Sequence, residues 1–127
     1  ENENARAYTS LGQLRYLSCM AQVDGVVGNS SSGLLEAPTL MKGTVNIGDR
    51  QQGRLQAESV INCAPDRQSI AAALEHLYAP DFQSKLSSVR NPYGDGGASG
   101  RIVEEIKRHR LEGIQKKQFV DLPAMPS

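Results

Sequence analysis

The sequence predicts an α/β fold in which helices cover a parallel sheet. Short apolar segments typical of strands alternate along the chain with segments whose apolar residues recur at helical spacing. The apolar segments also lack the polar alternation of half-exposed strands, so we expect them to be buried on both sides. Strands joined through helices run parallel and form one layer between helices.

The first half of the chain contains two expected strands and two expected helices. We expect a short strand at about residues 5–8 and a second strand at residues 23–27. Between them, residues 11–22 form a helix, because Leu11, Leu14, Leu17 and Ala21 recur at helical spacing. A serine-rich turn follows the second strand and leads into one or two turns of helix, which Pro38 closes.

The second half continues the alternation. Strands are expected at residues 43–47 and 59–63. Pro65 and Asp66 open the clearest amphipathic helix, whose apolar face holds Ile70, Ala73, Leu74, Leu77 and Tyr78. We then expect a helix at 81–89, a glycine-rich loop at 91–97, a charged helix at 99–117 and an irregular tail at 121–127; the charged helix has Ile102, Val103 and Ile106 as its apolar face.

Composition limits the classes of partner. The 127 residues suffice for one domain of modest size, and 14 basic residues balance 14 acidic ones. With no basic stripe and no tryptophan, nucleic acid is not expected as a partner. With no apolar run of membrane-spanning length and no signal peptide, we expect no membrane partner and a cytoplasmic location. The chain opens with Glu1-Asn2-Glu3-Asn4 and has no initial methionine. We therefore expect either a piece of a longer protein or a processed protein.

The cysteines do not indicate a metal site. Cys19 and Cys63 are far apart and match no metal-binding spacing. We expect both to be buried thiols in a reducing cytoplasm. His76 and His109 have no metal-like partner nearby in the sequence, so no metal and no cofactor are expected.

The turn at residues 28–33, Gly-Asn-Ser-Ser-Ser-Gly, is the most informative segment. Small side chains let a ligand approach the backbone, and the free N–H groups and hydroxyls at a helix start favour a phosphate. The alternative is a plain helix cap, in which Ser30 or Ser31 only satisfies a backbone N–H. In a parallel sheet, ligands bind at the carboxyl ends of the strands, where this turn is expected.

A second loop, residues 48–54, is expected at the same edge. Its Arg50 could pair with a phosphate in bidentate fashion, or Asp49 could hold Arg50 or Arg54 in a structural pair. Arg54 is by default a solvated surface residue. Glu36, one helical turn after Ser32, suits the vicinal hydroxyls of a ribose better than a phosphate, which it would repel; the alternative is a solvated helix residue.

These segments together resemble a known family. The serine turn with Glu36, the segment 45–54 (Val-Asn-Ile-Gly-Asp-Arg-Gln-Gln-Gly-Arg) and the segment 91–96 (Asn-Pro-Tyr-Gly-Asp-Gly) look like the C-terminal part of UDP-N-acetylglucosamine 2-epimerases. The three serines and the Gly-Asp-Arg-Gln sequence resemble the hydrolysing branch. The resemblance implies a glycosyltransferase-B-like fold of two Rossmann-like domains, of which residues 1–127 are the C-terminal portion of the nucleotide-binding domain.

The resemblance also implies roles. Ser30 and Ser31 would hold the diphosphate of a UDP-sugar, Glu36 would take the ribose hydroxyls, and Arg50 would reach the diphosphate or the sugar. The whole enzyme would release UDP and an N-acetylmannosamine-type sugar for sialic-acid-like biosynthesis. The family's catalytic acids lie in an N-terminal domain that this chain does not contain, so we expect no catalytic residue here and an inactive chain.

Two other functions stay open from the sequence. The chain could be the donor-binding half of a UDP-sugar glycosyltransferase, or a binding module without catalysis. A part-domain also leaves sheet edges and apolar surface uncovered, and such surfaces tend to pair. We therefore expect a homo-oligomer.

Overall fold

The computed structural model describes residues 3–110 and 112–113. The elements are α1 (Gly12–Gln22), β1 (Gly25–Gly28), α2 (Ser32–Leu35), the 3-10 helix η1 (Ala37–Leu40), β2 (Gly43–Ile47), β3 (Val60–Cys63), α3 (Arg67–Tyr78), α4 (Pro80–Lys85), the 3-10 helix η2 (Leu86–Ser88) and α5 (Ala98–Arg108). The chain divides into two compact units, residues 1–95 and residues 96–127, which are described separately.

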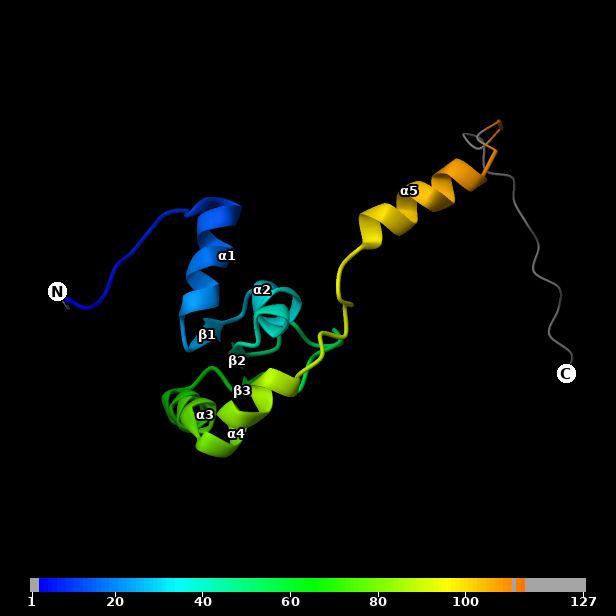
Figure 1. Ribbon diagram of the computed structural model, residues 1–127. Coiled ribbons are helices and arrows are strands. Elements are labelled where there is room, and N and C mark those ends of the chain that lie inside the picture. Colours follow the sequence, from blue (N-terminus) through cyan, green and yellow to red (C-terminus); the bar gives the residue numbers. More distant parts are fainter. Residues whose placement is uncertain (1–2, 111, 114–127) are drawn as a thin grey trace, which may run out of the picture. The chain divides into compact units, whose positions relative to one another are not determined.

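The first unit is built on a parallel sheet of strand order β1-β2-β3 (Figure 1). Val45 in β2 lies opposite Val27 in β1 and opposite Ile61 in β3. Parallel strands end at the same edge, so the loops after β1 and β2 lie beside each other at the carboxyl edge of the sheet.

One face of the sheet carries the apolar core. Buried Val45 packs there with residues of α3, α4 and η2, namely Ala73, Leu77, Phe82 and Leu86. A Cβ added at Gly43 would lie 2.9 Å from the Phe82 ring and would also collide with Leu77. The absence of a side chain at residue 43 therefore lets α3 and α4 approach the sheet closely.

The other face of the sheet packs against α2. The Thr44 hydroxyl donates to the carbonyl of Gly33 at 2.9 Å, and a Cβ on Gly33 would lie 2.5 Å from the Thr44 methyl group. Figure 1 shows α3 and α4 on one side of the sheet and α1 and α2 on the other. The predicted α/β fold with a parallel sheet between helices is confirmed.

The strands depart from the prediction in two ways. Residues 5–8 form no strand, because a strand needs a hydrogen-bonded neighbour and the sheet of the described residues contains β1, β2 and β3 alone. Burial on both sides holds for β2 only. Val27 in β1 is 50% exposed, because an edge strand has one strand neighbour and less helix above it.

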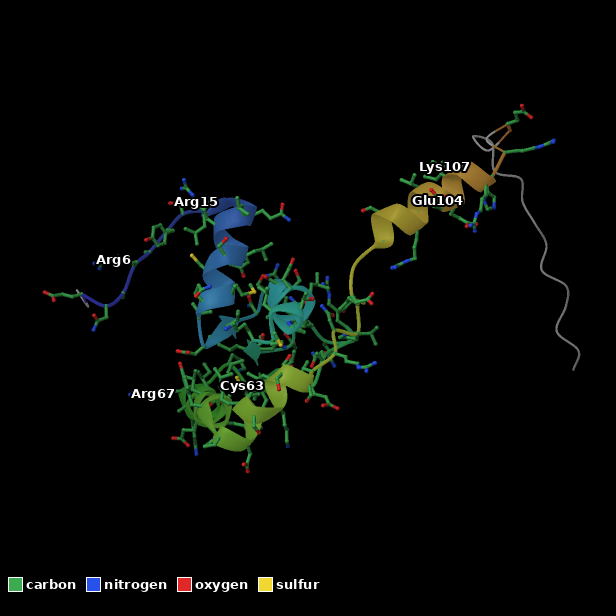
Figure 2. The ribbon with its side chains drawn as sticks, viewed as in Figure 1. Arg6, Arg15, Cys63, Arg67, Glu104 and Lys107 are labelled. Carbon is green, nitrogen blue, oxygen red and sulfur yellow. The ribbon has the colours of Figure 1, made fainter. Side chains whose placement is uncertain are left out.

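Helix α1 buries the predicted face only in part, because Leu11, Leu17 and Ala21 are half-buried. Met20 is its buried residue, whereas Leu14 is 81% exposed. Cys19, expected to be buried, is exposed, because it lies next to Met20 in the helix and therefore points about 100° away from it. Cys63, at the end of β3 (Figure 2), is half-buried and packs against the core.

Two helix details also differ from expectation. Pro38 does not close α2: the helix ends at Leu35, and Pro38 lies in the first turn of η1, where its missing N–H costs no helical bond. In α3 the predicted face is confirmed for Ala73 and Leu77, which are buried, but Tyr78 is 61% exposed at the helix end.

The second unit contains α5, which ends at Arg108 rather than at residue 117. The His109 amide donates to the carbonyl of Ile106 rather than to that of Glu105, which ends the α-helical pattern. The His109 ring Nδ1 lies 3.0 Å from the Glu105 carbonyl, where the backbone amide of a continuing helix would lie. Glu104 and Lys107 form a 3.0 Å ion pair on this helix (Figure 2). Residues 114–117 and the predicted tail at 121–127 lie outside the described residues.

Candidate functional site

The serine turn connects β1 to α2. Gly28, at the end of β1, has a φ of +148°, a conformation that glycine adopts without strain. The Ser30 hydroxyl accepts a 3.3 Å hydrogen bond from the amide of Ser32, so Ser30 satisfies the first backbone N–H of α2. The Ser31 side chain makes no capping bond to this helix. Both predicted serines therefore lie at the start of α2, with the Ser31 hydroxyl uncommitted to the cap.

A cavity of about 670 Å³ adjoins the turn. Its lining comes from the segment before α1, from α1 and from the turn, and combines apolar surface with the polar side chains of Thr9, Ser10, Gln13, Tyr16, Ser30 and Ser32. The Tyr16 hydroxyl bonds the Ser32 hydroxyl at 2.9 Å, which ties α1 to the turn. The cavity thus offers hydroxyl and amide groups to a polar ligand beside Ser30.

The second predicted loop meets the first at Asn29. Arg50 Nη1 lies 3.5 Å from the side-chain oxygen of Asn29, and Gln51 Nε2 donates to the Asn29 carbonyl at 2.7 Å. Gln51 is 3% exposed, so this bond anchors the loop from inside. Asn29 therefore brings Arg50 beside the serine turn, as the placement at the carboxyl edge predicts.

The alternative pairing for the arginines is not found. In the part of the chain that the structure describes, Asp49 makes no ion pair with Arg50 or with Arg54. Arg54 is exposed, in agreement with its default reading as a solvated residue. Arg50 is exposed as well, and the long contact to Asn29 is its one polar contact among the described residues, so its guanidinium keeps donors for a ligand.

Glu36 lies at the C-cap of α2 and is half-buried. Its Oε2 atom is buried and has no hydrogen-bond partner among the described residues. Buried carboxylate oxygens are normally paired, since an unpaired one costs the desolvation of a charged group. This oxygen is therefore an acceptor that a bound hydroxyl could satisfy.

Sequence reasoning missed three contributors to this site. It gave Asn29 no firm role and did not consider Gln51 or Tyr16, although all three make the contacts that join α1, the turn and the second loop. The side-chain amide of Asn29 in a glycine-rich turn is a weak sequence signal of a functional residue, because its bonding partner depends on tertiary packing.

The two histidines are exposed. His76 packs edge-on against the Phe82 ring, with centroids 5.0 Å apart, and His109, in the second unit, directly follows α5. Among the described residues, no group of three or more His, Cys, Asp and Glu side chains could hold a metal ion. None of the described helices is long and apolar enough to cross a membrane.

Comparison with known proteins decides the family. Residues 1–107 match the family described as UDP-N-acetylglucosamine 2-epimerase. The chain belongs to this family. The expected resemblance is thereby confirmed.

Relatives and a solved structure agree with the family. The chain is 37% identical over 109 residues to a polysialic acid biosynthesis protein of Escherichia coli, covering 85% of this chain and 28% of the relative. It is 34% identical over 122 residues to the hydrolysing GDP/UDP-N,N'-diacetylbacillosamine 2-epimerase of Campylobacter jejuni, covering 95% of this chain and 31% of that protein. A crystal structure of a UDP-N-acetylglucosamine 2-epimerase matches with a TM-score of 0.60 and 31% identity, over 84% of this chain and 29% of that one.

The chain thus spans about three-tenths of the length of the family members it matches. Relatives named as hydrolysing enzymes support the resemblance to the hydrolysing branch.

Proposed function

We propose that this chain is the UDP-binding part of a hydrolysing UDP-sugar 2-epimerase. The whole enzyme would convert UDP-N-acetylglucosamine or a related UDP-sugar, with water, into UDP and an N-acetylmannosamine-type sugar for sialic-acid-like biosynthesis. One observation carries the proposal: Asn29 brings the serine turn and Arg50 together at the carboxyl edge of the sheet.

The proposed roles follow the chemistry of each group. Ser30 and Ser31 hold the diphosphate, because their hydroxyls and the backbone N–H groups beside them donate to phosphate oxygens. Arg50 reaches the diphosphate or the sugar, since a guanidinium can pair with a phosphate through two parallel bonds. Glu36 accepts the ribose hydroxyls through its unpartnered oxygen.

The reaction would need these groups to hold the leaving group. A base outside this chain removes the proton on the carbon next to the anomeric carbon. The anomeric C–O bond breaks, and UDP leaves with the electron pair to give a glycal. Water then adds its hydroxyl to the anomeric carbon while a proton returns to the neighbouring carbon. Arg50 and the serine turn would stabilise the negative charge that develops on the departing diphosphate.

The proposed setting is a reducing compartment such as the cytoplasm. Cys19 and Cys63 are both free thiols, and Cys19 is exposed, which suits a compartment where thiols stay reduced. We also propose that residues 1–127 form the C-terminal portion of the nucleotide-binding domain; the chain matches 28% and 31% of the length of two relatives, which fits one part of a larger protein.

Product analysis on the full-length protein tests the proposal. Incubation with UDP-N-acetylglucosamine in D₂O should release UDP and a free mannosamine-type sugar that carries deuterium next to the anomeric carbon. Transfer of the sugar to an acceptor without free sugar would identify a glycosyltransferase, and no turnover at all would identify a binding module.

A matched pair of arginine variants localises the activity. Arg50→Ala should lower UDP affinity about tenfold, since a charge-assisted bond contributes about 1.5–3 kcal/mol. Arg54→Ala removes an exposed arginine of the same loop and should leave UDP affinity unchanged. Equal losses in both variants would point to general charge attraction rather than to a phosphate contact by Arg50.

A further inference from the structure

The segment after η2 returns to the α2–η1 corner through one side chain. Asn91 Nδ2 donates to the carbonyl of Leu35 at 2.7 Å and lies 2.7 Å from the Thr39 hydroxyl. Its Oδ1 accepts from the amide of Tyr93 at 3.0 Å, which fixes the turn that holds the side chain. Asn91 is half-buried, and its partners Leu35 and Thr39 are 56 and 52 residues away in the sequence.

The Leu35 carbonyl needs such a donor for a local reason. Helix α2 ends at Leu35, and the residue three positions later, which would supply a 3-10 bond, is Pro38. Proline has no N–H to donate. Asn91 therefore supplies a hydrogen bond that Pro38 cannot, at the carbonyl directly before Glu36.

This contact bears on the Glu36 side chain. Glu36 lies between α2 and η1, and Asn91 binds a residue on each side of it, Leu35 and Thr39. Two bonds from one amide hold both flanks of Glu36 and so set the direction in which its carboxylate leaves the backbone. The buried Oε2 of Glu36 has no partner of its own among the described residues that could do this.

The same segment also reaches the second loop. The Tyr93 hydroxyl donates to the Leu55 carbonyl at 3.1 Å, and Leu55 directly follows the loop of residues 48–54 that carries Arg50. Asn91 and Tyr93, two positions apart, thus hold the two segments on which the proposed ribose and phosphate contacts lie.

We propose that Asn91 and Tyr93 are positioning residues of the nucleotide site. Asn91 acts through Glu36 on recognition of the ribose, and Tyr93 acts through residues 48–54 on recognition of the diphosphate. The inference rests on the proposed function, because it assigns these roles relative to bound UDP. On this proposal the Asn-Pro-Tyr-Gly segment, residues 91–94, contributes to ligand selection as well as to the stability of the fold.

A purely structural role makes a different prediction. Loss of a buried hydrogen bond that only stabilises the fold would lower the unfolding temperature and weaken all ligands alike. Loss of a bond that orients Glu36 would weaken a ligand with ribose hydroxyls and spare a ligand without them. The ratio of the two affinities therefore separates the roles.

The experiment titrates the full-length protein with UDP and with 2′,3′-dideoxy-UDP by calorimetry. Asn91→Ala should weaken UDP about three- to tenfold, as expected when a charge-assisted contact loses its geometry, and should change the dideoxy ligand less than about twofold. If Asn91→Ala folds poorly, Asn91→Asp replaces it, because this variant keeps the acceptor for the Tyr93 amide and loses the donor. It should show the same difference between the two ligands. Tyr93→Phe should weaken both ligands by the same factor, and combined with Arg50→Ala it should weaken UDP no further than Arg50→Ala alone, whereas a purely structural loss would add to that of Arg50→Ala.

Gln83→Ala is the matched control. Gln83 Nε2 also donates to a backbone carbonyl near a helix end, that of Leu77 at 2.5 Å, but it lies on the core side of the sheet. This variant should lose thermal stability while the ratio of the two affinities stays that of the wild type.

A double variant tests whether Asn91 acts through Glu36. Asn91→Ala combined with Glu36→Gln should weaken UDP no further than Glu36→Gln alone. Equal weakening of both ligands by Asn91→Ala and by Asn91→Asp, or additive losses in the double variant, would overturn the inference while the proposed function stands. Failure of the wild-type protein to bind UDP would overturn the proposed function and this inference together.

Discussion

Glu36 is the residue for which we propose a contact with the ribose of the ligand. Its carboxylate is half-buried at the end of α2, and one oxygen has no partner among the described residues. A folded chain tolerates such a group at a site where a ligand supplies the missing hydrogen bonds. The ribose of UDP presents two neighbouring hydroxyls that a single carboxylate can accept.

Glu36→Gln in the full-length protein should therefore weaken UDP about tenfold or somewhat more, because charge-assisted hydrogen bonds contribute about 1.5–3 kcal/mol and neutral ones about 0.5–1.5. Affinity for 2′,3′-dideoxy-UDP should hardly change. Calorimetric titration of both ligands measures the difference. Ser30→Ala is the contrasting variant and should weaken both ligands alike. If Glu36→Gln did the same, Glu36 would only hold the helix in place.

Asp66 is a residue whose charge supports the fold. As the N-cap of α3 it accepts from the Ser69 amide at 2.9 Å and from the Ser69 hydroxyl at 2.6 Å. The Ser69 hydroxyl, and then the Ser69 amide, lower the pKa of Asp66 below its ordinary value. A depressed pKa means that the stabilisation is present above the unfolded value, about pH 4, and is lost as the pH falls through the folded value.

Asp66→Ala should therefore unfold at a lower temperature than the wild type at neutral pH, and the gap should narrow below about pH 4. Thermal unfolding followed by circular dichroism across this pH range measures the gap. Asp81→Ala, which removes an exposed carboxylate from the first turn of α4, is the control and should show a smaller gap at neutral pH. A constant gap for Asp66→Ala down to the lowest pH would rule out the charged cap as its cause.

At the scale of elements, the position of α2 depends on a close contact with β2. Gly33 lies against Thr44, which is 2% exposed and donates its hydroxyl to the Gly33 carbonyl. A methyl group on residue 33 would lie 2.5 Å from the Thr44 methyl group, so α2 would have to move away from the sheet. The serine turn directly precedes α2 and would move with it.

Gly33→Ala should destabilise the fold by about 1–3 kcal/mol, the usual cost of overpacking a core, and should weaken UDP and dideoxy-UDP alike. Thermal unfolding and titration of both ligands measure the two effects. Gly100→Ala introduces the same methyl group into α5, where nothing lies within 4 Å of it, and should only increase helical content. An unchanged unfolding temperature in Gly33→Ala would show that α2 is not held by this contact.

At the scale of the whole molecule, apolar surface remains uncovered in the first unit. Strand β1 pairs only with β2 among the described residues, and Val27 on it is 50% exposed. Val23, just before β1, is 42% exposed and Leu14 on α1 is 81% exposed. An unpaired edge strand beside apolar side chains tends to pair with another chain.

The 127-residue chain should therefore self-associate in solution. Size-exclusion chromatography with light scattering should give a mass above that of one chain. Val27→Lys should shift the distribution toward the monomer, because a lysine on an edge strand opposes pairing. A monodisperse wild-type monomer that unfolds cooperatively would contradict this expectation.

The isolated chain should also show no turnover. The proposed groups of the site bind and stabilise a leaving group, and general acid–base chemistry needs carboxyl groups placed against the sugar, which the resemblance puts in another domain. Incubation of the purified chain with UDP-N-acetylglucosamine should release no UDP. UDP release that disappears on substitution of Arg50 or Glu36 would contradict the expectation.

The sequence by itself determined the family and the elements that carry the site, although it also predicted a strand at residues 5–8 that does not form. Strands β2 and β3, helix α3 and the serine turn are encoded by local spacing, small residues and caps, and these signals act between near neighbours in the chain. The motifs around Glu36 and Arg50 identify the family for the same reason, since a binding loop keeps its residues close in sequence.

Only the tertiary structure decided which residues meet and which are covered. The bond from Asn91 to Leu35 spans 56 residues, and the contacts of Asn29 with Arg50 and Gln51 span 21 and 22. The exposure of Cys19 and the half-burial of β1 depend on what packs beside α1 and the sheet edge. Such outcomes arise from packing between distant segments, which local periodicity does not encode.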